Sequence, residues 1–365
     1  MASDTAAVSD SDFDTPRVWV LLGYGAGGNA QMHALARAVG WPYVAKTIVY
    51  NALNRLPNPL LGASLVSVDK QGSDPIEPPW PDLVIAASRR SAPVARWIKR
   101  ASGGRTRLVH LLHTQAPFEY FDLVVTLPQY QLPSAPNVVT NTLPLNHVDP
   151  EALAAAAQQW APAFTELPRP QIGVLVGGDS SSYRFDADTA ARLGQDINAQ
   201  AQKEGGSVLI TTSRRTPPKA ARALWQEITV PAYCYNWQSN DADNPYLGIL
   251  AHADKFVVTP DSASMPAEAC QMGRPVRIFD RSLTGARHKS QVRTWLGRWL
   301  VANGWYKPKR DFDAFHAGLY ARGLVNHDPM LAVPPDDLGR TAARARALVE
   351  GRQSGQHAVT SGQDK

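Results

Sequence analysis

The chain has 365 residues, of which 44% are hydrophobic and 19% are charged, a composition typical of a globular protein whose length predicts about two domains. No stretch approaches the roughly 20 apolar residues that a membrane span needs, and two cysteines exclude a disulfide framework or a cysteine-rich metal site. The net charge of +5 permits anionic substrates or an acidic membrane surface without requiring either.

The first half of the chain alternates strands with helices. After a polar segment 1–16, which we expect to be a disordered tail without a signal peptide, an apolar strand at Arg17–Leu22 leads into a glycine loop at Gly23–Asn29 and a helix through Val39. Further elements are strands at Tyr43–Ile48, Leu83–Ala86, Leu108–Leu112 and Leu123–Thr126, and a helix at Ala92–Ala101. Short apolar strands between helices predict a parallel sheet covered on both faces, in an N-terminal domain over residues 17–162.

The same pattern restarts after a proline-rich linker over residues 163–170. A strand at Ile172–Val176 leads into a second glycine loop at Gly177–Ser182 and a helix at Ala187–Glu204. Later strands are predicted at Val208–Thr212, Ala232–Tyr235, Phe256–Thr259 and Val276–Phe279. We therefore expect two doubly wound, Rossmann-like α/β domains facing a central cleft. The second would span residues 171–333, followed by a C-terminal helix over 334–351 and a disordered tail over 352–365.

The most informative stretch follows the strand that ends at Thr259. Asp261, Ser262 and Ser264 stand where a helix must begin, and Pro266 suits the first helical turn. Free N–H groups and small hydroxyls at a helix N-terminus form an anion site, and Glu268 could accept hydrogen bonds from sugar hydroxyls. The stretch therefore favours a nucleotide diphosphate and its ribose.

Other loops at predicted strand ends are rich in glycine, hydroxyls and arginine. Neither glycine loop fits the dinucleotide fingerprint or the P-loop, which argues against NAD. The pairs Arg89–Arg90 and Arg214–Arg215 are either solvated surface charge or phosphate ligands. The acidic run around Asp241 and Asp243 resembles a metal-binding triplet but is interpreted as a solvated turn, so we expect no metal and no cofactor.

Several motifs together resemble the mitochondrial fission ELM (elongated mitochondria) family and its bacterial relatives. They are Gly27–Gln31, Trp80–Pro93, Gly177–Ser180, Thr211–Pro217, Asn244–Tyr246 and Asp261–Glu268, and they stand in one order between about Val18 and about Gly304. The resemblance implies a glycosyltransferase fold of the GT-B type, although plant members are known as fission factors. It also implies that Glu268 holds the ribose of a nucleotide while Ser262 and Ser264 face the diphosphate.

The predicted function is transfer of a sugar from a nucleotide-diphosphate donor, with UDP favoured, to a glycan or glycolipid acceptor. The donor-binding candidates are Gly178, Asp179, Ser180, Thr212, Ser213, Arg214, Arg215, Asn244, Tyr246, Asp261, Ser262, Ser264 and Glu268. The acceptor-binding candidates are Gly25, Gly27, Gly28, Gln31, Ser88, Arg89, Arg90 and Gln115. The catalytic candidates are His113, Asn29 and Glu119, with Asp179 as a rival base or a loop-bonding residue.

Two alternative functions remain at this point, a nucleotide-sugar epimerase and a non-catalytic binding protein. The absence of a recognition motif argues against nucleic acid. The segment Trp295–Arg310 is either core with surface charge or an interfacial helix that contacts an acidic membrane. We expect a cytoplasmic protein, which such an interfacial helix would allow to contact the inner membrane peripherally.

Overall fold

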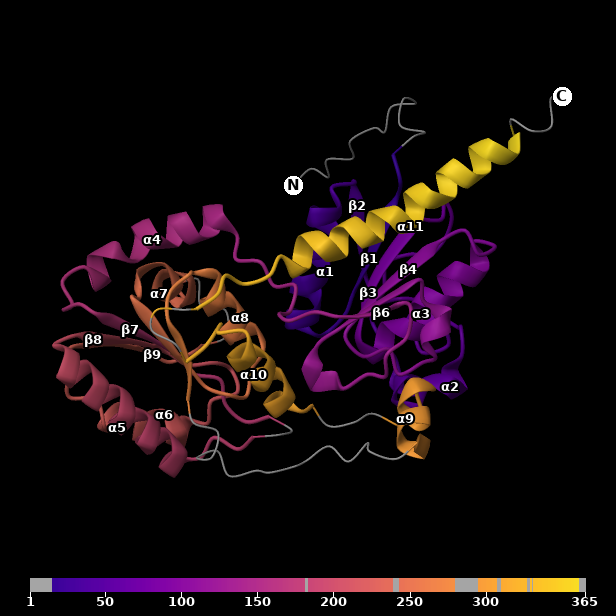
Figure 1. Cartoon of the computed structure of the whole chain (residues 1–365). Coiled ribbons are helices and arrows are strands. Elements are labelled where there is room, and N and C mark those ends of the chain that lie inside the picture. The colour runs from indigo at the N-terminus through magenta and orange to yellow at the C-terminus, as the bar shows by residue number, and fades with distance from the viewer. Residues whose placement is uncertain are drawn as a thin grey trace.

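The computed structural model describes residues 15–180, 183–238, 243–279, 295–306, 310–326, 329 and 331–360. Two parallel sheets lie side by side, one in each half of the molecule (Figure 1). The predicted fold class, two doubly wound α/β domains facing a cleft, is confirmed, and this arrangement is the GT-B type. The N-terminal tail predicted over residues 1–16 lies almost wholly outside the described residues.

The N-terminal sheet has six parallel strands in the order β2-β1-β3-β4-β5-β6. The strands are β1 (Val18–Leu22), β2 (Tyr43–Thr47), β3 (Leu83–Ala87), β4 (Arg107–Leu111), β5 (Leu123–Thr126) and β6 (Val138–Thr140). The helices are α1 (Ala26–Val39), α2 (Asn58–Leu61) and α3 (Ser88–Ala101), with short 3-10 turns η1 (Ala52–Arg55), η2 (Phe118–Tyr120) and η3 (Pro128–Tyr130). Alternate residues of β1 enter two separate cores, one on each face of the sheet.

The C-terminal sheet has five parallel strands in the order β11-β10-β7-β8-β9. The strands are β7 (Gln171–Leu175), β8 (Ser207–Thr211), β9 (Ala232–Tyr235), β10 (Lys255–Val258) and β11 (Val276–Ile278). Its helices include α5 (Ala187–Glu204), α6 (Pro218–Gln226), α7 (Tyr246–His252) and α8 (Ser264–Gln271). Buried clusters again cover both faces, which is why the strands consist of continuous apolar runs.

Each sheet reverses its strand order at one point. In the N-terminal sheet the reversal lies between β1 and β3, and in the C-terminal sheet it lies between β7 and β10. At such a point neighbouring strand-to-helix loops diverge to opposite faces and leave a crevice at the carboxyl ends of the strands. Ligands of doubly wound sheets bind in that crevice, so this topology predicts a site in the loops that follow β1, β3, β7 and β10.

The chain crosses between the two halves more often than the predicted domain limits allow. The helix α4 (Pro150–Phe164), expected in the N-terminal domain, packs against α7 and its residue Phe164 belongs to the C-terminal core. Of the later helices, α9 (Trp295–Ala302) lies on the N-terminal half through Ala302, whereas α10 (Phe312–Ala321) enters the C-terminal core. The chain therefore crosses between the two halves at both ends of the C-terminal sheet, before β7 and again around α9 and α10.

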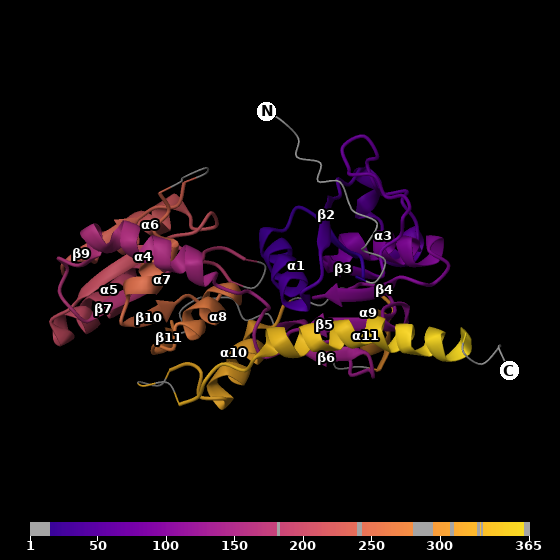
Figure 2. The same ribbon diagram turned by 90° about the horizontal axis from the view of Figure 1, so that it is seen from above.

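The last helix, α11, returns to the N-terminal half. It spans Asp337–Thr360 and packs along α1, where Ala345 and Val349 complete one core of the first sheet (Figure 2). The helix continues past its predicted end at residue 351, so the tail expected over residues 352–365 begins as helix. Burial of small apolar side chains against α1 explains this return.

Candidate functional site

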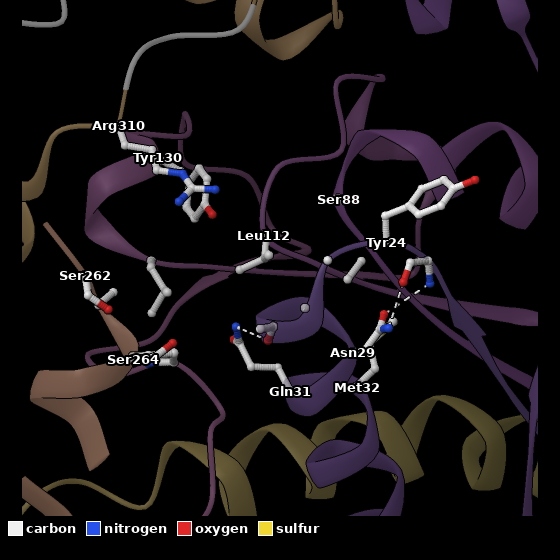
Figure 3. Close-up of a pocket in the computed structure, with 18 of the residues that line it drawn as sticks. Tyr24, Asn29, Gln31, Met32, Ser88, Leu112, Tyr130, Ser262, Ser264 and Arg310 are labelled. Atoms are coloured by element: carbon white, nitrogen blue, oxygen red, sulfur yellow. Dashed lines mark hydrogen bonds between the residues drawn. The ribbon is translucent and has the colours of Figure 1, made fainter. Parts of the chain in front are cut away.

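A cavity of about 850 Å³ opens between the two halves. It is lined from the N-terminal half by residues that follow β1, β3, β4 and β5, and from the C-terminal half by residues that follow β7, β8 and β10 (Figure 3). Both strand-order reversals therefore face the same space. Thirteen predicted site residues are among those that line it: Gly25, Gly27, Gly28, Asn29, Gln31, Ser88, Arg90, Ser180, Arg214, Arg215, Asp261, Ser262 and Ser264.

The charge of the lining is strongly positive. Its described residues include four arginines, at positions 90, 214, 215 and 310, and one carboxylate, Asp261. Asp261 is 5% exposed and forms an ion pair with Arg215 at 2.6 Å. It also accepts hydrogen bonds from the Gly178 amide at 3.0 Å and the Thr259 hydroxyl at 2.6 Å. The only acid among these residues is thus committed to the protein, and the cavity is suited to an anion.

The two arginines after β8 have different roles. Arg215 binds Asp261 and donates to the Asp179 carbonyl at 3.1 Å, so its guanidinium joins two loops of the site. Arg214 is exposed, lines the cavity and forms no hydrogen bond or ion pair within the part of the chain that the structure describes. Arg214 is therefore the side chain of this pair that can bind a ligand phosphate without losing a protein contact.

The pair at the start of α3 divides in the same way. Arg89 donates to the carbonyl of Leu56 at 2.8 Å and to both oxygens of Asn54, which directs it away from the cavity. Arg90 lines the cavity, and its guanidinium lies 5.4 Å from the centre of the Tyr24 ring. Arg89 is not among the residues that line the cavity, because its donors hold the segment around Asn54.

The two glycine loops also serve different purposes. A side chain at Gly177 would meet the Asp261 carboxylate at 2.1 Å, and one at Gly178, whose φ is +156°, would meet the Arg215 carbonyl at 2.1 Å. These glycines are needed for packing between loops, and Gly178 does not line the cavity. At Gly25 and Gly27, by contrast, a side chain would find open space. There the missing side chains leave room for a ligand.

Three helices begin at the cavity. The first residues of α1, α3 and α8 line it, and each helix presents N–H groups that no intrahelical carbonyl accepts. Ser262 satisfies one such group, because its hydroxyl accepts from the Met265 amide at 3.4 Å. The positive ends of these helix dipoles add to the charge of the arginines.

Two residues of the lining hold an unusual backbone conformation. Ser88 has φ +67° and Leu112 has φ +70°, a region that residues with a side chain rarely adopt. The Ser88 carbonyl is held by the ring Nε2 of His110 at 3.0 Å, which requires the proton on that nitrogen. His110 is fully buried, and burial lowers the pKa of its imidazole to about 3. Such strain is frequent where a loop must present a ligand surface.

Glu268 does not line the cavity. Its Oε1 accepts from the Asn146 side chain at 2.7 Å and its Oε2 accepts from the Tyr246 hydroxyl, so both oxygens are used within the protein. Burial raises the pKa of Glu268 and raises that of Tyr246 well above its usual value. Gln271, one turn further along α8, donates to the Asn146 carbonyl at 2.7 Å. The predicted ribose ligand thus binds the segment that connects the two halves.

Four other donor candidates form bonds inside the C-terminal half and are not among the lining residues. Thr212 accepts from the Trp237 amide, Ser213 donates to the Gly177 carbonyl, Asp179 accepts from the Phe185 amide, and Asn244 accepts from the Tyr246 amide, at 2.6–3.0 Å. For Asp179 this is the loop-bonding alternative, and Asn244 acts at the start of α7. Short polar side chains after strands often bond their own loop in this manner.

None of the catalytic candidates is placed as a base. His113 is buried outside the lining, and its Nδ1 accepts from the Gln115 amide at 2.9 Å. Gln115 is itself buried outside the lining, and Glu119 is exposed on η2 away from it. Asn29 does line the cavity, but its amide closes the glycine loop through two bonds to Gly23, at 2.8 and 3.1 Å.

One wall of the cavity is formed by residues that are not among the predicted site residues. Gln129 and Tyr130 follow β5 and line it, and the Arg310 guanidinium lies 5.6 Å from the centre of the Tyr130 ring (Figure 3). The strand-end rule that identified the other loops applies to the loop after β5 as well. Arg310 ends the segment Trp295–Arg310, whose pattern indicates either core with surface charge or an interfacial helix, and its place at the cavity is decided by the tertiary structure.

Neither a metal site nor a membrane-spanning helix is found among the residues that the structure describes. Among these residues no group of three histidine, cysteine or acidic side chains could hold a metal, and Asp241 lies outside them. No helix found there is both long and apolar enough to cross a bilayer. The surface of α9 is apolar nevertheless, with Trp295 79% and Trp299 45% exposed.

Comparisons with known proteins identify the family. The model of the mitochondrial fission ELM1 family matches residues 26–347, so the chain belongs to this family. It is 30% identical over 289 residues to the mitochondrial fission protein ELM1 of Arabidopsis thaliana, covering 68% of this chain and 66% of that protein. The chain thus spans about two thirds of the length of its plant relative. Protein RP120 of Rickettsia prowazekii (strain Madrid E) is 26% identical over 294 residues, covering 72% and 82% of the two chains.

Solved structures resemble the chain more remotely. A glycosyltransferase from Rickettsia africae ESF-5 is 11% identical with a TM-score of 0.44, covering 93% of this chain and 94% of that one. The UDP-GlcNAc 2-epimerase from Neisseria meningitidis bound to UDP-GlcNAc is 11% identical with a TM-score of 0.45, covering 93% and 100%.

Proposed function

We propose that the protein is a glycosyltransferase that binds a nucleotide-diphosphate sugar, with UDP favoured, in the cavity between its two halves. The observation that carries this proposal is the charge of the lining, in which four arginines face one carboxylate that is already ion-paired. Three helix N-termini point to the same space. A diphosphate is the common ligand that matches several cations and exposed backbone amides together.

The donor would occupy the C-terminal end of the cavity. Arg214 and the N-terminal turn of α8, with Ser262 and Ser264, would bind the diphosphate. When the bond between the anomeric carbon and the diphosphate breaks, negative charge develops on the departing oxygen, and these groups stabilise it. The nucleoside diphosphate leaves with the electron pair of the broken bond, the acceptor oxygen bonds to the anomeric carbon, and the acceptor proton passes to water. Cations supplied by the protein make a divalent metal unnecessary in this proposal.

A non-catalytic nucleotide-binding protein is the second candidate, and one observation favours it. The lining residues that the structure describes include no histidine and no carboxylate apart from Asp261. An epimerase needs acids and bases at the sugar even more than a transferase does, so the same observation counts against that alternative.

A nucleotide survey separates these functions. Thermal unfolding with UDP, GDP, CDP and ADP should show stabilisation, largest for UDP. The protein should then be incubated with UDP-sugars and bacterial envelope extracts, and mass spectrometry should detect a glycosylated product. Conversion of the sugar without acceptor would indicate an epimerase, binding without turnover would indicate the non-catalytic candidate, and no stabilisation by any nucleotide would refute the proposal.

We further propose that α9 brings the protein to an acidic membrane where a lipid-linked acceptor is available. The helix lies on the N-terminal half, and its exposed Trp295 and Trp299 are residue types that favour the bilayer interface. Co-sedimentation with vesicles containing anionic lipid should be lost in the double variant Trp295→Ser/Trp299→Ser. Equal sedimentation of this variant and the wild type would exclude a role for α9.

A further inference from the structure

The cavity has two ends that differ in composition. Tyr24 and Ser88 lie on the side of the N-terminal half, opposite Ser262 and Ser264, with Leu112 between them (Figure 3). We call the first side the N-terminal end; it is formed by Tyr24, Gly25, Gly27, Ser88 and Arg90. The donor diphosphate of the proposed function occupies the other end, so the N-terminal end requires a ligand of its own.

Arg90 is the cation of the N-terminal end. It is exposed and contacts the Tyr24 ring, but it forms no ion pair with a carboxylate in the described parts of the chain. It also stands in the first turn of α3, where the helix dipole opposes a positive charge. Since Arg89 already makes the local contacts of this turn, Arg90 is not needed to hold the loop. An anionic ligand would compensate for the unfavourable position.

The charge of the whole lining leads to the same conclusion. Four guanidinium groups and one carboxylate leave an excess of three positive charges among the described lining residues. The diphosphate of a nucleotide sugar carries one negative charge on each phosphate, which leaves positive charge uncompensated. Because Arg214 and Arg215 are at the donor end, part of that excess remains at Arg90.

The N-terminal end also has room for a compact group. Side chains at Gly25 and Gly27 would meet no atom within 4 Å, and Gly25 has an ordinary φ of −91°, so its backbone does not require glycine. The space allows a ligand oxygen to approach the first amides of α1. On another wall, Gln129 is 3% exposed, and its Oε1 accepts no hydrogen bond from the described residues. A ligand hydroxyl would satisfy it.

We propose that the N-terminal end binds a phosphate monoester carried by the acceptor, so that the sugar is transferred to a phosphorylated alcohol. Arg90 forms the charge-assisted contacts to this phosphate, and the space beside Gly25 and Gly27 accommodates its oxygens. The identity of this ligand as a sugar acceptor rests on the proposed function. The phosphate site itself does not depend on catalysis and is measurable by binding alone.

The test is calorimetric titration of the full chain, saturated with UDP, using inorganic phosphate as the probe. Saturable binding is expected, and Arg90→Gln should weaken it by about tenfold or more, the effect of losing a charged hydrogen bond. UDP affinity of this variant should stay within about twofold of the wild type. Arg100→Gln is the matched control, because Arg100 is exposed near the other end of α3.

Other outcomes separate this inference from the proposed function. Displacement of UDP by phosphate, or equal phosphate binding by wild type and Arg90→Gln, would overturn the N-terminal site. Failure of UDP to bind would refute the donor proposal, whereas phosphate binding that depends on Arg90 would still support this site. Glycerol 3-phosphate and phosphatidylcholine vesicles with phosphatidic acid then distinguish a soluble acceptor from a lipid headgroup, and binding of either through Arg90 supports the site.

Discussion

Arg215 Nη1 lies 2.6 Å from a carboxylate oxygen of Asp261, and this ion pair joins the loops that follow β8 and β10. Asp261 is also bonded to the Gly178 amide after β7, so three strand ends meet at one buried carboxylate. These contacts fix the C-terminal wall of the cavity before any ligand arrives. Arg214 next to them forms no hydrogen bond or ion pair with the described residues and remains available to a ligand.

Arg215→Gln should affect stability, whereas Arg214→Gln should affect ligand binding. The first leaves the buried Asp261 without its cation and should lower the free energy of unfolding by about 2 kcal/mol, less than for a fully buried pair because Arg215 is 37% exposed. Arg214→Gln should leave stability unchanged and weaken UDP binding by about tenfold or more. Urea unfolding and calorimetry measure both quantities. Unchanged UDP affinity in Arg214→Gln would show that Arg214 is a solvated surface residue and does not bind the diphosphate.

Alanine at two glycines should separate packing from ligand clearance. In Gly178→Ala the new methyl group would lie 2.1 Å from the Arg215 carbonyl, so we expect a loss of about 3 kcal/mol or more. In Gly27→Ala the methyl group enters open space on α1, which should stabilise the fold by up to about 1 kcal/mol and weaken ligand binding. Tighter or equal binding of UDP and phosphate by Gly27→Ala would show that no ligand approaches this loop.

Glu268→Ala tests whether this residue joins the two halves or holds a ribose. The substitution leaves the Asn146 amide and the Tyr246 hydroxyl without their acceptor, so we expect a loss of about 2 kcal/mol in unfolding free energy. Nucleotide affinity should change by less than about threefold. Tyr246→Phe is the control that removes one of the two contacts and should lose less stability. Intact stability together with lost UDP affinity would support the ribose role instead.

His110 should make stability depend on acidic pH. Its folded-state pKa is about 3 because of burial, whereas the pKa of an exposed histidine is 6.5. Below pH 6.5 the unfolded chain takes up a proton that the folded protein does not, so stability falls as the pH decreases toward 3. Between pH 7 and pH 4.5 the wild type should therefore lose about 2.5 kcal/mol more than His110→Gln.

The control for this measurement is His147→Gln, since His147 is exposed. Urea unfolding of the three proteins at both pH values gives the comparison. A variant at His110 whose stability changes with pH as steeply as that of the wild type would show that another group is responsible.

Much of the fold follows from local sequence patterns. Apolar runs such as Leu83–Ala86 and Val208–Thr212 predict buried parallel strands, and the structure has β3 at Leu83–Ala87 and β8 at Ser207–Thr211 with both faces of the sheets covered. Glycine and hydroxyl residues mark the turns that follow. The strand-end rule then identifies most loops of the cavity, including those that contain Ser88 and Ser262.

The roles of individual side chains in those loops depend on partners far away in the sequence. In both arginine pairs, the member with an internal role is selected by its partners: Asn54 and Leu56 bind Arg89, and Asp261 binds Arg215. Glu268 has the motif of a ribose ligand, yet Asn146 and Tyr246 occupy it. The sequence by itself determined the sheets, the crevice loops and the excess of cations. Only the tertiary structure decided which cations remain for a ligand, because a guanidinium or carboxylate that meets an internal partner is no longer available to the cavity.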